Sequence, residues 1–174
     1  LQTCLAIQNS GGEIFSHSIN GDVFTESTTR LDAENRLATS KIVLQNAGLI
    51  INGFVKPGGP GSLGFLTMFE DIIRKYYRYG YSCSENANQY KEWRWGMGTS
   101  IATLKAQIDS DVKNKTLLTL YSHSLTEVPE ATVRELIEYI QAKGSGAAIT
   151  TFGNLYNTFG TTELERRITA LEVI

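Results

Sequence analysis

Short β-rich apolar runs alternate with amphipathic helical patterns along most of this chain, and this alternation limits the folds open to it. Helices are predicted where apolar residues recur on one helical face, and strands where short apolar runs end at turn residues. Alternation of this kind implies parallel strands joined by helical crossovers, in an open sheet or a barrel. The predicted strands are 13–16, 49–55, 81–84, 117–123 and 147–151, and the predicted helices are 32–47, 65–79, 100–114, 129–143 and 162–174.

The length of 174 residues favours one domain over residues 1–174. Residues 1–8 have the pattern of the second half of an amphipathic helix, and Asn9 and Gly11 supply its end. The chain is therefore expected to open within a structural unit, as a fragment or a processed product does.

The chain contains two histidines, and both stand at the carboxyl ends of predicted strands in the context Ser-His-Ser. His17 ends the first strand pattern and His123 ends the strand pattern 117–123, while a Pro- and Gly-rich loop, 56–61, follows the strand pattern 49–55. In parallel α/β architectures, ligands bind beyond the carboxyl ends of the strands. We therefore expect the three elements to share one rim, although a histidine at a strand end can also be an ordinary polar group of the fold.

These segments resemble the polysaccharide deacetylases of carbohydrate esterase family four, which carry the NodB homology domain, over nearly the whole chain. The segment 12–18, Gly-Glu-Ile-Phe-Ser-His-Ser, is similar to the family segment that ends in a metal-binding histidine, so the resemblance implies that His17 is a metal ligand. The segment 120–124, Leu-Tyr-Ser-His-Ser, resembles the last family motif and makes His123 the general acid. The substrate groove of the family matches Lys56, Pro57, Gly58 and Gly59. The implied fold is a distorted or incomplete (β/α) barrel of α/β class.

Two departures from the family pattern concern the metal. The second metal histidine of the family lies four positions after the first, where this chain has Gly21, and Asp22 follows as the alternative ligand. The family's aspartate pair, which supplies the catalytic base and a further ligand, belongs to a strand expected before Leu1, and no two aspartates are adjacent in these residues. The implied cofactor is a divalent metal, zinc, held by His17 and Asp22 if the site is intact.

The resemblance implies metal-dependent deacetylation of an N- or O-acetylated polysaccharide or cell-wall glycan, in an extracellular, cell-wall-associated or virion-associated protein. The alternative is a non-catalytic carbohydrate-binding or structural module of a phage tail or cell-wall assembly. In that case the aromatic segment 90–95 could stack on sugars, although burial in a core is the more common role of such residues. A third interpretation makes the loop 57–61 a phosphate cradle, but the lysine and hydroxyl that follow the glycines of a P-loop are missing.

Charge and hydropathy argue against two other classes, nucleic-acid-binding and membrane-spanning proteins. The net charge of -2 argues against nucleic-acid binding, with the short basic patch 74–79 as the exception. No apolar run reaches the length of a membrane span. Cys4 and Cys83 match no metal-ligand spacing, and they can be paired or free. The oligomeric state stays open.

Overall fold

The computed structural model describes residues 1–25, 27–58, 64–81, 95–123, 126–155 and 157–158. These residues group into two compact units. The first unit holds the described residues up to 81 together with 151–158, and the second holds 95–150. The expectation of one domain over residues 1–174 stays a prediction.

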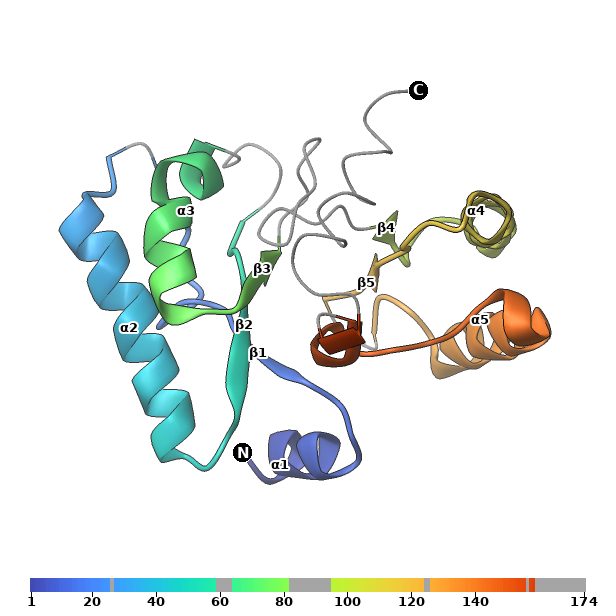
Figure 1. The fold of residues 1–174 in the computed structure, drawn as a ribbon, viewed down its shortest axis with the longest axis horizontal. Coiled ribbons are helices and arrows are strands. Elements are labelled where there is room, and N and C mark those ends of the chain that lie inside the picture. Colours follow the sequence, from blue (N-terminus) through green and yellow to red (C-terminus); the bar gives the residue numbers. More distant parts are fainter. Residues whose placement is uncertain (26, 59–63, 82–94, 124–125, 156, 159–174) are drawn as a thin grey trace. The chain divides into compact units, whose positions relative to one another are not determined.

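A parallel three-stranded sheet, in the order β1-β2-β3, forms the centre of the first unit. Helices join its strands, so that β1-α2-β2 and β2-α3-β3 are successive crossovers, as Figure 1 shows. The register pairs Ser16 with Phe54 and Phe54 with Gly80. The elements are α1 (Gln2–Asn9), β1 (Ile14–Ser16), α2 (Arg30–Asn46), β2 (Ile51–Val55), α3 (Gly64–Tyr76) and β3 (Tyr79–Tyr81).

Helix α2 begins at a side-chain cap and buries one face against the sheet. The Thr29 hydroxyl accepts a hydrogen bond from the Asp32 amide at 3.2 Å, which satisfies one of the free N–H groups of the first turn. Ala33, Leu37 and Ser40 are its buried residues and recur at the spacing of one helical face. Helices α2 and α3 pack against each other beside the sheet (Figure 1).

Apolar side chains fill the space between these helices and the sheet, and a second cluster lies on the other face of the sheet. Phe54 belongs to the first cluster and Val55 to the second, because consecutive strand residues point to opposite faces. In the second cluster, Val55 joins Phe15, Tyr79, Phe152 and Leu155. The buried members of the first are Phe24, Ala33, Leu37, Leu49, Ile51, Phe54, Phe69, Ile72, Ile73 and Tyr77.

The carboxylate of Glu13 connects the segment 151–155 to the start of β1. Its oxygens accept hydrogen bonds from the backbone N–H groups of Phe152 at 2.9 Å and Gly153 at 2.8 Å, and from the Tyr79 hydroxyl at 2.9 Å. Burial, followed by the bond to Glu13, raises the pKa of Tyr79 above its usual value. Three donors on one carboxylate therefore join chain segments that are more than 60 residues apart in sequence.

The prediction for residues 65–79 is wrong in its end, and the prediction for residues 147–151 is wrong in its type. The helix predicted over 65–79 ends at Tyr76, because the Arg78 N–H donates to the Asn52 carbonyl at 2.7 Å and the chain joins β2 as strand β3 from Tyr79. Residues 147–151 form no strand. Ile149 is 59% exposed, so the apolar run that predicted a buried strand does not reach a core.

Gly53 in β2 lies where no side chain fits, and we expect Gly53→Ala to lower the free energy of unfolding by about 1 to 3 kcal/mol. A Cβ at this position would overlap the ring of Phe15 and lie 2.7 Å from Cε2 of Tyr79, which is buried. Urea unfolding followed by circular dichroism measures the change. Gly98→Ala is the matched control, because a Cβ there has no atom within 4 Å, and equal stabilities for the two variants would contradict the prediction.

The second unit contains one parallel strand pair and two packed helices. Its elements are β4 (Trp95–Gly96), α4 (Ile101–Asn114), β5 (Leu120–Tyr121), α5 (Glu130–Gln141) and the 3-10 helix η2 (Gly144–Gly146). Leu104, Ile108 and Leu136 form its buried core. The predicted helices 100–114 and 129–143 are confirmed with small changes of bounds, whereas the predicted strand 117–123 is reduced to the two residues of β5.

The described strands neither show nor refute the predicted (β/α) barrel, which stays a prediction. The predicted helix 162–174, Cys83 and residues 90–94 of the aromatic segment lie outside the described residues. In the described part of the chain, no helix combines the length and the apolar character needed to cross a bilayer.

Candidate functional site

His17 lies directly beyond the carboxyl end of β1, as predicted, and its imidazole is fixed by the neighbouring strand. Its Nδ1 lies 2.8 Å from the carbonyl oxygen of Val55, the last residue of β2. Because a carbonyl oxygen can only accept, Nδ1 carries the hydrogen in this contact. The neutral ring then keeps its lone pair on Nε2, which is the arrangement of a histidine ready to bind a metal or accept a proton.

The predicted groove residues begin at the adjacent strand end. Lys56 and Pro57 follow β2 directly and are buried, whereas Gly58 is exposed with φ +85°. Since β1 and β2 are parallel, His17 and this segment lie at the same edge of the sheet. Gly59 lies outside the described residues. The structure thus brings His17 together with Lys56, Pro57 and Gly58, while their roles stay predictions.

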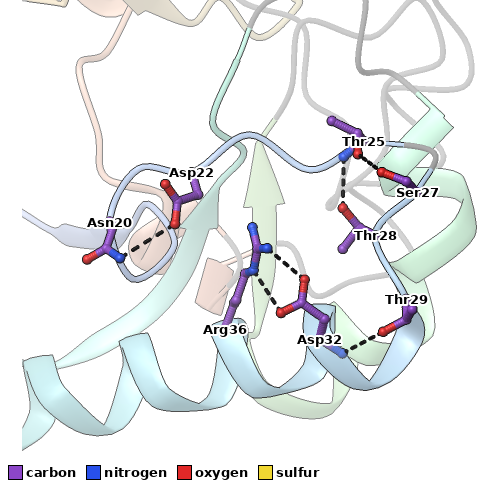
Figure 2. A network of polar contacts seen from close by, with 8 residues as sticks. All are labelled: Asn20, Asp22, Thr25, Ser27, Thr28, Thr29, Asp32 and Arg36. Carbon is purple, nitrogen blue, oxygen red and sulfur yellow. Dashed lines mark hydrogen bonds and ion pairs between the residues drawn. The ribbon is translucent and has the colours of Figure 1, made fainter.

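Asp22 lies on the exposed loop between β1 and α2, and Figure 2 shows it beside Asn20. The Asn20 side-chain amide donates to Oδ2 of Asp22 at 3.5 Å. Two residues later the fully buried ring of Phe24 anchors the loop, with the Arg36 guanidinium 5.6 Å from the ring centroid. Arg36 also pairs with Asp32 in the first turn of α2, as Figure 2 shows. The loop is therefore fixed to α2 at Phe24, and Asp22 lies on its exposed part.

The donors in the described residues do not make up a zinc site. A catalytic zinc ion needs three protein ligands and an open position. No group of three His, Cys, Asp or Glu side chains that could hold a metal occurs within the described ranges. His17 and Asp22 alone do not fit the implied metal.

A buried set of hydroxyl groups lies next to His17, and sequence reasoning missed it. The Oγ atoms of Ser16 and Ser40 are 2.7 Å apart, and Ser40 Oγ donates to the Ser18 carbonyl at 3.1 Å. The Tyr77 hydroxyl lies 3.0 Å from Ser16 Oγ and 2.7 Å from the Leu37 carbonyl. Burial raises the pKa of Tyr77 to about 12. The available signal was Ser40 itself, a polar residue on the apolar face of a predicted helix.

His123 lies in the second unit, two residues beyond the end of β5, and is exposed. Its backbone N–H donates to Oε2 of Glu127 at 2.9 Å, and its Nδ1 lies 3.2 Å from the same oxygen. The backbone N–H of His123 is the first cause that lowers the pKa of Glu127 below its usual value. The Tyr121 ring meets the imidazole edge to face at 5.6 Å. Glu127 thus holds Nδ1 of His123, a contact that the motif around the histidine did not indicate.

The two histidines belong to different compact units. His17 is placed by the β1-β2-β3 sheet and His123 by the loop after β5. The expectation that both lie on one rim stays a prediction, as does the role of His123 as general acid.

Comparison of the chain with family models, with curated proteins and with solved structures finds no match. The resemblance to polysaccharide deacetylases therefore depends on the motif residues around His17, Lys56 and His123.

Proposed function

We propose that this chain is a polysaccharide-deacetylase-like domain whose site lies at the carboxyl edge of the β1-β2-β3 sheet and takes an acetylated polysaccharide. One observation carries the proposal. His17 stands at the end of β1 with Nδ1 bound to the Val55 carbonyl, beside the segment that begins at Lys56. This arrangement leaves Nε2 available to a ligand at the edge where parallel α/β folds bind substrates.

The reaction implied by the resemblance is hydrolysis of an N- or O-acetyl group with zinc, and its test is acetate release. The protein is incubated with an acetylated chitooligosaccharide or a peptidoglycan fragment, with and without added zinc. The proposal expects wild-type protein to release acetate and the His17→Ala variant to release none. If the wild-type protein releases no acetate from these acetylated glycans, the catalytic form of the proposal is contradicted.

We expect His17→Ala to weaken binding of the acetylated oligosaccharide by about tenfold, because a lost hydrogen bond to the ligand costs about 1.4 kcal/mol. Calorimetric titration with the acetylated oligosaccharide measures the loss. Gln45→Ala is the matched control, because Gln45 is exposed near the carboxyl end of α2, which lies at the opposite edge of the sheet from His17. Equal affinities for wild type and His17→Ala would contradict a binding role for His17.

The second candidate function is a non-catalytic carbohydrate-binding or structural module, as in a phage tail or cell-wall assembly. Gly21 favours it: this residue stands where the family has its second metal histidine, and its φ of +69° is a conformation that favours glycine. The lack of a three-donor group in the described part of the chain agrees with this candidate. Binding on a glycan array without acetate release would support it over the catalytic form.

A further inference from the structure

We propose that Ser40 is a positioning residue for His17, which deepens the proposed function because it acts on the same site. One hydroxyl on α2 contacts the residue on each side of the histidine. Ser40 Oγ lies 2.7 Å from Ser16 Oγ and donates to the Ser18 carbonyl at 3.1 Å. The backbone that carries His17 is therefore held at both of its neighbours by a single side chain.

Counting hydrogens gives these bonds a direction. The Ser18 carbonyl can only accept, so Ser40 donates its single hydroxyl hydrogen to it. In the contact between the two hydroxyls, Ser16 is therefore the donor and Ser40 the acceptor. The single hydrogen of Ser16 is then used as well, so Tyr77 is the donor in its 3.0 Å contact with Ser16 and shares its hydrogen with the Leu37 carbonyl. The chain of donors thus runs from Tyr77 through Ser16 and Ser40 to the carbonyl that follows His17.

The backbone conformation of Ser18 shows why the hydrogen bond from Ser40 is needed. Ser18 has φ +65°, a left-handed conformation that costs a non-glycine residue about 1 kcal/mol or more and persists where the surroundings fix it. It is only 8% exposed, and its own Oγ has no hydrogen-bond partner among the described residues. Its side chain therefore contributes no bond that would hold the turn, and the bond from Ser40 to its carbonyl does so.

The backbone conformation at Ser18 determines the position of the His17 imidazole. His17 is exposed, so few packing contacts restrain its ring, and the bond from Nδ1 to the Val55 carbonyl at 2.8 Å forms only if the backbone at 16–18 stays in place. Ser16 and Ser40 are both buried, which keeps water from competing for their hydroxyls. Ser40 thereby keeps the hydrogen on Nδ1 and leaves Nε2 as the free nitrogen.

The tautomer of His17 tests the proposal directly. Nitrogen-detected NMR of histidine-labelled protein, at a pH that keeps the imidazole neutral, reports which ring nitrogen carries the hydrogen. His17→Ala assigns the signals, since the chain has two histidines. Wild type is expected to show the Nδ1–H form of His17, and Ser40→Ala is expected to lower the ratio of Nδ1–H to Nε2–H by about fivefold or more, the effect of losing one net hydrogen bond.

Three further variants make the result specific to the hydroxyl of Ser40. Ser40→Thr keeps a hydroxyl and is expected to retain the wild-type tautomer. Thr39→Ala removes an exposed hydroxyl from the same helix and is expected to change nothing. Ser40→Cys keeps the shape of the side chain with a weaker donor, so it provides the shifted ratio in a folded protein if Ser40→Ala does not fold.

A folded Ser40→Ala or Ser40→Cys protein with the wild-type tautomer of His17 would overturn the proposal. The spectra need neither metal nor glycan, so this outcome is separate from a failure of the proposed function. That failure would appear as a protein with the expected tautomers that neither binds acetylated glycan nor releases acetate.

Discussion

Phe54→Ala is expected to lower the free energy of unfolding by about 3 to 5 kcal/mol, the largest effect among the substitutions considered for this chain. Phe54 is fully buried in the central strand of the sheet. Its ring centroid lies 6.3 Å from that of Phe24 and 5.4 Å from that of Tyr77. Truncation therefore removes contacts with Phe24 in the loop after His17 and with Tyr77, the residue that follows α3, and leaves a cavity that the surroundings can fill only in part.

Chemical denaturation of wild type and variant measures this change. Ile50→Ala is the matched control, because Ile50 directly precedes the same strand but is 64% exposed, and its truncation should change stability by no more than about 0.5 kcal/mol. A Phe54→Ala protein as stable as the Ile50→Ala control would show that the cluster between α2, α3 and the sheet is not the core of this unit.

Alkaline conditions are expected to remove about 3 kcal/mol of stability through Tyr77 alone. Burial raises its pKa from 10.0 to about 12 in the folded protein, and each pKa unit corresponds to about 1.4 kcal/mol. Above about pH 10 the unfolded chain loses the phenol proton while the folded chain retains it, so stability falls as the pH rises. This contribution is fully present below about pH 10 and is lost by about pH 12. Tyr79, whose pKa is also raised, should add to the loss.

Urea unfolding at a series of alkaline pH values measures the slope, and phenolate absorbance reports the ionisation. Tyr77→Phe should flatten the slope above about pH 10 and remove one late-titrating phenol from the absorbance curve. Below that pH the variant should be less stable by about 1 to 3 kcal/mol, because the Leu37 carbonyl loses its buried donor. An unchanged alkaline slope in Tyr77→Phe would contradict the assignment of the effect to this residue.

Helices with a clear apolar face and end signals could be predicted from the sequence. The pattern with Ala33 and Leu37 gave α2, and Pro129 marked the start of α5. The end of α3 was predicted wrongly because Tyr77 continues the helical apolar spacing, while its neighbour Arg78 already bonds to Asn52 of β2. That competition is between a local pattern and a partner more than 20 residues away, which periodicity does not contain.

The candidate site was predictable only in part, for the same reason. His17 follows an apolar run and precedes turn residues, so its place at a strand end could be predicted from local sequence. The partner of its imidazole, Val55, lies 38 residues from His17 in the sequence. The hydroxyls that contact Ser16 belong to Ser40, 24 residues away, and to Tyr77, 61 residues away. No spacing rule links such residues, because they meet only after the helices have packed on the sheet.

The sequence by itself determined the helices α2, α4 and α5, the parallel pairing that follows from helical crossovers, and the position of His17 at the end of β1. These depend on periodicity and on turn residues, which act over a few positions. The tertiary structure decided which nitrogen of His17 carries its hydrogen, that Ser40 holds the turn, and that Glu13 joins residues 152 and 153 to β1. Hydrogen bonds of this kind require distant groups to be brought within about 3 Å of each other, and only the packed fold supplies that proximity.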